Sequence, residues 1–481
     1  MLFNSIDFAI FLPIVFGLYW GLKGKTRVQN IFLLVASYVF YGWWDWRFLS
    51  LILISSAVDY SLALGMVAAP PARRKALLGC SLIVNLGLLG VFKYYNFFAN
   101  SFVEMFSVLG MDIHRSGLNI VLPVGISFYT FQALSYTIDV YRKKIEPVRD
   151  VVVFFTFVSF FPQLVAGPIE RASHMLPQFA RDRHFDYEKA VDGLRQILWG
   201  FFKKVVIADT CAVWVNQIFD APDQYHGFLL LLGIFLFAFQ VYGDFSGYSD
   251  IAIGLCRLFG FSLMRNFSYP YFSRDIAEFW RRWHISLTTW FRDYVYIPLG
   301  GNRGTKWKSL RNIFVVFLVS GLWHGANWTF VVWGLLNALY FLPLFLTGAH
   351  RTHVGSPVGH GRRLPSGKEL GQILCTASLT GLAWVFFRSA SVSDALHYLY
   401  CLFTRLFLSM DGFSVPDMKV RYLFPIVLLI VVEWLQRDRQ HGLDFDHRKI
   451  PRAVRWGAYY ALVGLLLFAA GSPQEFIYFQ F

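Results

Sequence analysis

The sequence predicts an all-α polytopic membrane protein, and three observations predict it. Of the 481 residues, 56% are hydrophobic and only 15% are charged, which excludes an ordinary water-soluble domain. Apolar runs close to the ~20 residues needed to cross a bilayer recur along the whole chain. Proline and glycine interrupt several runs, and broken helices are tolerated at membrane depth only where protein or a water-filled cavity satisfies the backbone. We therefore expect about 11 to 13 transmembrane helices, and roughly two or three re-entrant pieces between residues 155 and 300.

The basic residues indicate the orientation of the chain and not a nucleic-acid partner. The formal net charge is +14, and the Lys and Arg residues fall in short loops between apolar runs, as the positive-inside rule describes. The rule places the loops 23–27, 70–75 and 142–149 in the cytoplasm and the loop 43–47 outside. Both termini are then expected on the outer, periplasmic side of the cytoplasmic (inner) membrane. The first apolar run, after Asp7, is expected to be a retained span and not a signal peptide.

We expect one integral-membrane domain over residues 1–481, with N-terminal helices in 1–120, a catalytic core in 121–345 and C-terminal helices in 346–481. Glycine and proline predict interrupted helices at LPVGISFYTF, FFPQLVAGPIE and FQVYGDFSGYSD. Three polar stretches are expected to be basic loops: 170–189, 348–370 and 437–455. The first two are expected to be cytoplasmic connections that take no part in catalysis.

The cysteines lie far apart and form no Cys-x-x-Cys pair. We expect buried, unreactive thiols, because the local sequence gives none of them an electropositive partner. Neither a disulfide framework nor a metal site is therefore expected. The five residues are Cys80, Cys211, Cys256, Cys375 and Cys401.

The stretch NFSYPYFSRDIAEFWRRWHISLTTWFRDYVYIPLGGNR, 266–303, carries the densest polar and aromatic pattern. Ser273 can cap a helix with Asp275 in its first turn. Two sets of residues then share helix faces. The charged set is Arg274, Glu278 and Arg282, and the aromatic set is Trp280, Trp283, His284 and Leu287. The pattern predicts one amphipathic helix with His284 on its aromatic face, and an anchoring helix at the membrane interface is the alternative.

A second histidine lies in LVSGLWHGANW, 318–328. Gly321 and Gly325 are four residues apart, which lets another helix approach closely. Ionisable groups within a span tend to face a cavity or a partner, so His324 is either a hydrogen-bonded structural residue or part of a site. Neutral imidazole can accept a proton from a hydroxyl, and His284 and His324 could meet across a central cavity. The sequence has no HExxH, GxSxG or Walker pattern, which leaves zinc hydrolysis, a serine triad and phosphoryl transfer without support.

Four further charged residues are weaker candidates. Lys203 and Lys204 are expected to mark the end of a span, with binding of donor phosphates as the alternative. Asp244 and Asp250 could cap helices, pair with the basic 281–282 region or line a cavity, and capping or ion pairing is favoured.

These motifs resemble those of the membrane-bound O-acyltransferases (MBOAT). The resemblance is carried by WRRWHISLTTWFRDYVYIPLGGNR and SGLWHGANWTFVVWG, supported by LPVGISFYTFQALSYTIDVYR, FFPQLVAGPIER, FQVYGDFSGYSDIAIG and the terminal EFIYFQF. It is strongest with the bacterial branch that contains the alginate O-acetylation protein AlgI and the D-alanyl transfer protein DltB. The length and the insert 348–370 favour the AlgI side.

The resemblance implies a ring of transmembrane helices with funnels that meet at a central catalytic tunnel. His324 matches the family's essential histidine, which implies a general base, and His284 matches the second position, which implies an orienting or oxyanion-stabilising role. The other tunnel-lining candidates are Trp280, Trp283, Trp323, Asn327, Tyr242, Asp244, Arg281 and Arg282.

The implied reaction is transfer of an acyl group, acetyl in the favoured reading, from a cytoplasmic thioester to a hydroxyl on the outer side. Acetyl-CoA or a carrier-protein thioester would be the donor, and no tightly bound cofactor or metal is expected. An exported or membrane-anchored O-acetyltransferase would complete O-acetylation of a polysaccharide such as alginate. The alternatives are D-alanyl transfer to a cell-wall polymer, a proton-coupled transporter that uses the same buried His and Asp residues, and an assembly scaffold.

Overall fold

The computed structural model describes residues 1–111, 120–165, 167–355, 357–409, 412, 423–445, 450–469 and 474–477, and this part of the chain is helical without strands. Ala166 in the 160–171 motif and the last four residues of the terminal EFIYFQF lie outside the described residues. The chain divides into two compact units. The first comprises Met1–Gly193 with Ala252–Met264, and the second comprises Leu194–Ile251 with Arg265–Phe481.

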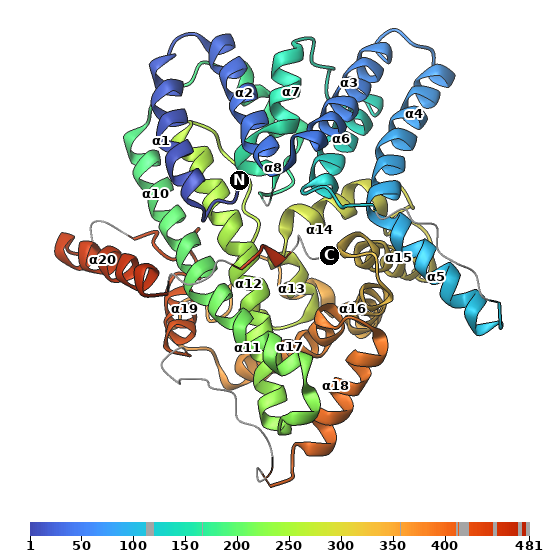
Figure 1. The fold of residues 1–481 in the computed structure, drawn as a ribbon, viewed down its shortest axis with the longest axis vertical. Coiled ribbons are helices and arrows are strands. Elements are labelled where there is room, and N and C mark those ends of the chain that lie inside the picture. Colours follow the sequence, from blue (N-terminus) through green and yellow to red (C-terminus); the bar gives the residue numbers. More distant parts are fainter. Residues whose placement is uncertain are drawn as a thin grey trace. The chain divides into compact units, whose positions relative to one another are not determined.

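The first unit is a bundle of antiparallel helices that follow one another along the chain (Figure 1). Helix α2 packs against α7, and α3 packs against α4, α6 and α7. The elements are α1 (Ile6–Gly21), α2 (Thr26–Asp45), η1 (Trp46–Phe48), α3 (Leu49–Gly65), α4 (Pro71–Leu89), η2 (Gly90–Tyr94), α5 (Tyr95–Val108), α6 (Ile126–Tyr141), α7 (Val151–Ser159), α8 (Phe161–Leu164), α9 (Ala172–Ala180) and the first half of α10 (Tyr187–Phe201).

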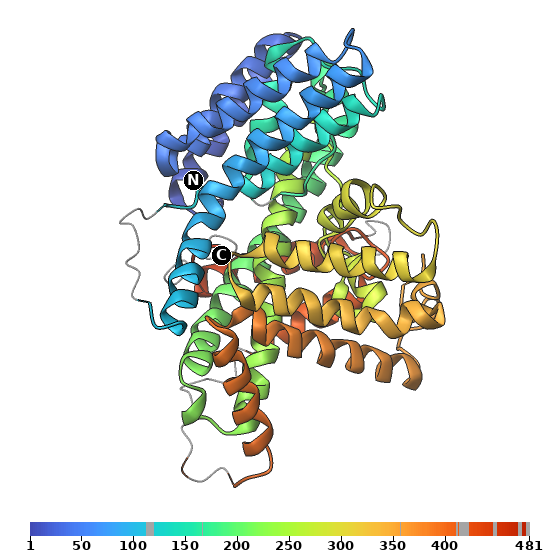
Figure 2. The same ribbon diagram turned by 90° about the vertical axis from the view of Figure 1, so that its right-hand side faces the viewer.

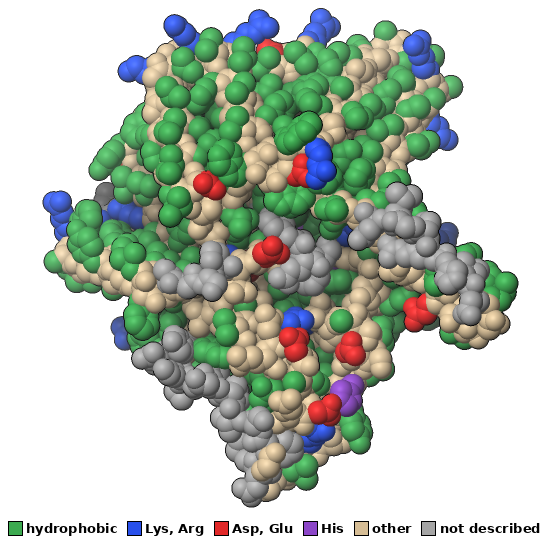
Figure 3. Space-filling model, in the orientation of Figure 1, with side chains coloured by type: hydrophobic (Ala, Val, Ile, Leu, Met, Phe, Trp, Pro, Cys, Tyr) green, Lys and Arg blue, Asp and Glu red, His purple; other side chains and the backbone are tan. Residues whose placement is uncertain are grey.

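The three basic loops of this unit meet at one end of its helices. The guanidinium of Arg74 donates to the carbonyls of Val140 (3.0 Å) and Tyr141 (2.8 Å), which joins the loop 70–75 to the end of α6, where the loop 142–149 begins. A cavity of about 800 Å³ is lined by residues of both 26–30 and 144–153, which joins the first loop to the third. Figure 3 shows Lys and Arg side chains along this end, with hydrophobic side chains on the flanks below it. The three loops that the positive-inside rule assigns to one side therefore lie at one end of this unit, and the side of the membrane that this end faces stays a prediction.

The second unit contains three long helices, α15, α16 and α17, which lie side by side (Figure 2). Its elements are the rest of α10, η3 (Phe202–Ala208), α11 (Asp209–Asp220), η4 (Pro222–Gln224), α12 (Gly227–Leu258, to Ile251), η5 (Pro270–Phe272), α13 (Ile276–Arg282), α14 (Ile285–Phe291), η6 (Arg292–Tyr296), α15 (Lys306–His324), α16 (Trp328–Thr347), η7 (Ala349–Arg351), α17 (Gly367–Arg388), α18 (Val392–Arg405), α19 (Phe424–Leu435) and α20 (Arg452–Ala469).

Among the described residues, five helical stretches are long and apolar enough to cross a membrane, and shorter apolar helices accompany them. The all-α, multi-pass fold class is thereby confirmed, whereas the number of spans stays a prediction. The five stretches are Thr26–Gly65, Pro71–Val108, Gly227–Leu258, Trp328–Thr347 and Gly367–Arg388.

The interrupted helices were predicted correctly in part. The helix of FFPQLVAGPIE breaks as expected, because α7 ends at Ser159 and Pro162 lies in the first turn of α8. The prediction of a break in FQVYGDFSGYSD is wrong, since α12 runs unbroken for 32 residues. A Cβ at Gly243 would lie 2.8 Å from the Lys203 carbonyl oxygen, so this glycine admits a neighbouring backbone and does not end the helix. The stretch 170–189, expected to be loop-like, contains α9.

Two of the five cysteines also differ from the prediction. Cys80 and Cys375 are exposed, whereas Cys211, Cys256 and Cys401 are buried. An apolar run in a membrane protein places side chains on outward faces as well as in the core, so sequence hydropathy does not separate the two.

The α15–α16 hairpin depends on the close approach that Gly321 allows. A Cβ at this position would collide with the Phe330 carbonyl oxygen, and one at Gly334 would lie 2.5 Å from the Phe317 carbonyl oxygen. We expect Gly321→Ala to destabilise the protein by ~1 to 3 kcal/mol, because two backbones must separate. Thermal unfolding of the purified protein in detergent measures this as a lower Tm.

Gly79→Ala is the matched control, because it also lies within a helix and no atom lies within 4 Å of the added Cβ. Alanine favours a helix over glycine by roughly 0.5 to 1 kcal/mol, so this control should keep or raise Tm. Equal Tm values for the Gly321 and Gly79 variants would contradict the packing argument.

Candidate active site

His284 lies at a backbone kink between two short helices and not within one helix. Its φ of 43° and ψ of 54° are left-handed, where a non-glycine residue costs about 1 to 2 kcal/mol. Helix α13 ends at Arg282 and α14 begins at Ile285, so the prediction of one continuous amphipathic helix is wrong. The predicted cap is also different, because the side chain of Asp275, not Ser273, accepts from the Glu278 N–H at 2.7 Å. The kink, and not helical periodicity, therefore sets the direction of the His284 side chain.

Asn266, which lies outside both short helices, holds this kink in place. Its backbone carbonyl accepts from the Ile285 N–H (2.9 Å), and its side-chain oxygen accepts from the N–H (3.3 Å) and hydroxyl (2.9 Å) of Ser286. Its amide nitrogen donates to Ser249 Oγ at 3.0 Å. Asn266 is completely buried, so these bonds have no competition from water. Sequence reasoning missed this residue, although it begins the stretch that contains His284.

Asn266→Ala is expected to lower both stability and turnover. The substitution leaves the buried Ser286 groups without their acceptor, at a cost of about 1 to 3 kcal/mol, and loosens the kink that aims His284. Tm and kcat of the purified variant measure the two effects. Asn85→Ala is the control, because Asn85 is equally buried and hydrogen-bonded to Ser55 and Asp59 in the first unit. The Asn85→Ala variant should lower Tm and leave kcat unchanged. An equal loss of kcat in this control would exclude the positioning role of Asn266.

His324 is the last residue of α15, and the chain turns at Gly325 before α16 begins. Its ring contacts the rings of Trp323 (4.9 Å), Trp333 (5.0 Å) and Phe387 (5.5 Å). It is 3% exposed. The histidine that the sequence places inside an apolar run therefore lies at a helix end, enclosed by aromatic rings.

The structure brings the two predicted histidines together in the second unit. Their ring centroids are 6.5 Å apart, and Trp323 lies 5.9 Å from the His284 ring. His284 is 1% exposed and packs edge-on against Phe245 at 4.5 Å. Neither of its ring nitrogens has a hydrogen-bond partner among the described residues. Buried polar atoms are almost always satisfied, so a pair of unsatisfied ring nitrogens marks a position that a water or a substrate can fill.

Tryptophans surround the two histidines. Trp283 is buried and packs at a tilt against Trp384, with ring centroids 5.2 Å apart, and Trp280 meets Trp333 edge-on at 5.6 Å. The indole nitrogen of Trp280 is buried without a hydrogen-bond partner in the described part of the chain. Trp280, Trp283 and Trp323 were proposed from the sequence, whereas Trp333 and Trp384 were missed because they lie on α16 and α17. The wall is apolar with few polar groups, as small-molecule sites usually are.

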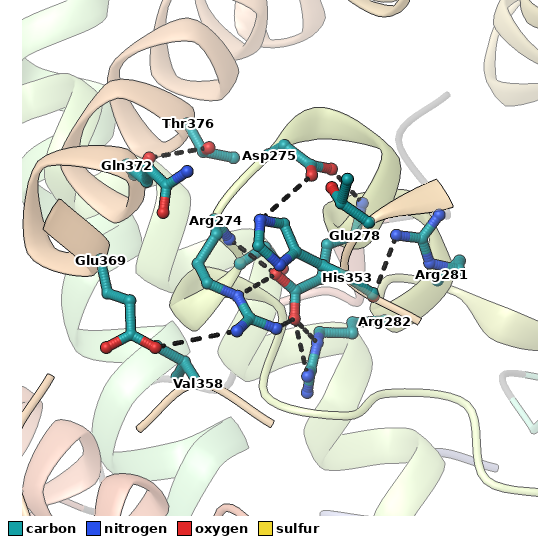
Figure 4. A network of polar contacts seen from close by, with 12 residues as sticks. Arg274, Asp275, Glu278, Arg281, Arg282, His353, Val358, Glu369, Gln372 and Thr376 are labelled. Carbon is teal, nitrogen blue, oxygen red and sulfur yellow. Dashed lines mark hydrogen bonds and ion pairs between the residues drawn. The ribbon is translucent and has the colours of Figure 1, made fainter. Parts of the chain in front are cut away.

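The charged face of α13 pairs as the sequence predicts. Glu278 is buried and accepts from Arg274 Nε (3.0 Å) and from a terminal nitrogen of Arg282 (2.8 Å). Figure 4 shows the two guanidinium groups converging on this carboxylate. Two cations around one buried carboxylate give α13 a fixed orientation at the cost of desolvation.

The insert 348–370 is docked on the same helix. Arg281 donates to the backbone carbonyls of His350 (3.0 Å) and His353 (3.1 Å), and the His353 ring lies 3.9 Å from Asp275 (Figure 4). Arg274 also lies 3.8 Å from Glu369 at the start of α17. The side chains of Arg281 and Arg282 are therefore engaged in holding α13, and their predicted contact with substrate stays a prediction.

The lysine pair is buried among carboxylates and does not mark an exposed span end. Lys203 lies 2.6 Å from Asp250, and Lys204 lies 2.8 Å from both Asp244 and Asp209. Both lysines belong to η3, a π-helical turn, and such turns are frequent at functional sites. The favoured ion pairing of Asp244 and Asp250 is present, with these lysines as partners in place of the 281–282 region.

The remaining candidates make defined structural contacts. Tyr242 donates to the buried Glu433 at 2.9 Å, and its ring lies 6.1 Å from Trp283. Asp244 accepts from the Ile477 N–H at 2.7 Å, which attaches the C-terminal segment to α12. Asn327 caps α16 through the Thr329 N–H and donates to the Ala390 carbonyl at 2.7 Å. Their roles toward a substrate stay predictions.

A family model of the membrane-bound O-acyltransferases matches residues 41–354, which include both histidines. The chain belongs to the membrane-bound O-acyltransferase family. A probable alginate O-acetylase AlgI of Pseudomonas syringae pv. tomato is 41% identical over 82% of this chain and 74% of its own length. The peptidoglycan O-acetyltransferase of Helicobacter pylori is 32% identical over 100% of this chain and 98% of its own. The teichoic acid D-alanyltransferase of Bacillus subtilis is 29% identical over 47% of this chain and 60% of its own.

The resemblance found in the sequence is thus confirmed. This member of the membrane-bound O-acyltransferase family is an acyltransferase enzyme with a multi-pass, helical fold. A buried histidine pair in an aromatic wall suits that chemistry, because an acyl transfer needs a proton acceptor and a hydrogen-bond donor in a site that excludes water.

Proposed function

We propose that the chain takes an acetyl group from acetyl-CoA on the cytoplasmic side and passes it across the membrane to a hydroxyl acceptor, for O-acetylation of an exported polysaccharide. The observation that carries the proposal is the pairing of His284 and His324, with ring centroids 6.5 Å apart in a buried aromatic site. Two imidazoles this close together can act on neighbouring atoms of one reacting group.

His324 would act as the general base. Its imidazole removes the proton of the acceptor hydroxyl while the oxygen attacks the thioester carbonyl, and the same proton then goes to the departing thiolate. The position of His324 at the C-terminal end of α15 favours this role, because the negative end of the helix dipole stabilises the imidazolium that forms.

His284 would hold the carbonyl oxygen. It lies at the N-terminal end of α14, where the helix dipole disfavours an added positive charge, so a neutral ring with one N–H is expected there. That N–H can donate to the oxyanion of the tetrahedral intermediate. Its freedom from partners among the described residues supports the role.

The donor is inferred from the charge of the first unit. The cavity between the first and third basic loops is lined by Arg27, Lys144 and Arg149, and cations at such a position suit the phosphates of a nucleotide thioester. Glu146 and Asp150 line the same cavity, so only the part of the cavity near the basic side chains would attract phosphate groups.

The acceptor side is inferred from the relatives. The alginate and peptidoglycan enzymes are named as O-acetylating glycans, and their matches cover more of this chain than the teichoic acid D-alanyltransferase does. We therefore favour acetyl transfer to a polysaccharide, completed by an exported or membrane-anchored O-acetyltransferase, over D-alanyl transfer.

The test supplies the purified protein in liposomes with acetyl-CoA labelled in the acetyl group and, separately, with a D-alanyl carrier-protein thioester. We expect hydroxyl-dependent release of free CoA and label on the hydroxyl acceptor. Consumption of the D-alanyl thioester alone would replace the acetyl assignment, and stability of both donors would overturn thioester-dependent transfer.

A further inference from the structure

An aspartate, a histidine and a cysteine converge at the junction of η4 and α18, apart from the histidine pair. One ligand atom from each of Asp223, His397 and Cys401 lies within 4.8 Å of the others. His397 Nε2 is 2.9 Å from Asp223 Oδ2, and Cys401 Sγ is 3.6 Å from both His397 Nε2 and Asp223 Oδ1. The geometry points to a zinc site formed by these three side chains, with its fourth position open to solvent.

The distances match a tetrahedral zinc site closely. With Zn–S near 2.3 Å and Zn–N and Zn–O near 2.0 to 2.1 Å, the sulfur and nitrogen of a tetrahedron lie about 3.6 Å apart, and the nitrogen and oxygen about 3.3 Å apart. The observed sulfur–nitrogen distance is 3.6 Å, and the nitrogen–oxygen distance is 2.9 Å. The carboxylate need move only a few tenths of an ångström to admit the ion. A thiolate, an imidazole and a carboxylate are also a donor set that zinc prefers.

The sequence places these ligands by simple helix geometry. His397 and Cys401 are four residues apart on α18, so their side chains share one face. Asp223 comes from η4, which follows α11. Arg405, four residues further along α18, donates to Asp223 Oδ1 (2.9 Å) and to the Asp223 carbonyl (2.6 Å). One carboxylate oxygen is thereby oriented by Arg405, as outer-shell partners orient metal ligands, while Oδ2 stays on the histidine side.

Exposure of the cluster fits an open site. The side chains of His397 and Asp223 are 47% and 61% exposed, whereas Cys401 is buried beneath them. Zinc would replace the thiol proton, which passes to solvent, and would bind the imidazole in its neutral form. Sequence spacing does not reveal this site, because Asp223 is more than 170 positions away from the other two ligands.

The ion would fasten η4 and the start of α12 to α18. The end of α18 already packs tightly there, because a Cβ at Gly227 would lie 2.6 Å from the backbone of Leu406. Zinc that binds the folded state and not the unfolded one raises stability in proportion to the logarithm of its concentration above the dissociation constant. We expect zinc to raise Tm of the wild-type protein.

The test uses the full chain in detergent, purified on an affinity tag without histidine and stripped with a chelator. Zinc alone is titrated against a chromophoric chelator, and cobalt alone is used for the absorption spectrum, since Co²⁺–thiolate coordination gives a near-ultraviolet charge-transfer band. We expect one equivalent of bound metal, with Cys401→Ser and His397→Ala each weakening zinc binding at least about tenfold. Cys375→Ser and His360→Ala, at exposed positions outside the cluster, are the matched controls and should bind as the wild type does.

A second variant keeps the test decisive if Cys401→Ser does not fold. In the Cys80→Ser, Cys375→Ser double variant, both exposed thiols are removed, and the cobalt–thiolate band should persist. Absence of the band in that variant, or zinc binding by Cys401→Ser equal to that of the wild type, would overturn the site.

Discussion

His324→Ala is expected to lower kcat for acetyl transfer by about 10² to 10⁴-fold, which is the usual contribution of a positioned general base. The change removes the proton acceptor and leaves the aromatic wall of Trp323, Trp333 and Phe387 in place. KM for acetyl-CoA should change little, because the imidazole acts on the acceptor hydroxyl in the transition state. Initial rates of CoA release by the purified protein, at saturating acetyl-CoA and acceptor, measure the effect.

His324→Gln separates a base from a structural hydrogen bond. Glutamine keeps a polar group of similar reach, but its amide does not accept a proton near neutral pH. A catalytic base predicts that the Gln and Ala variants lose kcat equally, whereas a structural histidine predicts that Gln restores most of it. His360→Ala, on the exposed part of the insert, should behave as the wild type.

The helical fold was predictable because apolar runs and proline act through the local chain. Pro162 lacks an N–H and therefore marked the break between α7 and α8. Gly243 and Gly247 also predicted a helix break, but α12 continues through both. Whether a glycine ends a helix or admits a neighbour depends on the backbone packed against it, here that of residues 200–204, which sequence alone does not provide.

The proximity of the two histidines was predictable, but the local backbone geometry was not. Aromatic flanks and motif resemblance selected His284 and His324, and the structure places them in one site. The 276–291 stretch contains no glycine or proline, so its sequence does not indicate a kink at His284. The kink is decided by Asn266, whose hydrogen bonds come from outside the helix. The burial of Lys203 likewise depends on Asp250, from a different helix.

His284→Asn is expected to retain part of the activity, whereas His284→Ala should lower kcat by about 10² to 10³-fold, the cost of losing one oxyanion donor. The reason lies in both the side chain and the backbone. Asparagine has an N–H donor and tolerates the left-handed conformation that His284 adopts at φ 43°. Alanine has no donor and meets the same backbone strain as histidine.

His284→Gly separates the two contributions. Glycine adopts φ 43° without strain, so this variant should unfold at a Tm no lower than that of the alanine variant, yet it has no donor for the oxyanion. If hydrogen bonding to the intermediate is the role of His284, kcat of the Gly variant falls to the level of the Ala variant and only Asn retains activity. If the kink alone matters, Gly and Asn retain activity together, and the oxyanion role is excluded. Asn266 fixes the kink through hydrogen bonds from outside the two helices. We therefore expect all three variants to keep the backbone conformation at residue 284, so that kcat depends on whether the side chain has a hydrogen-bond donor.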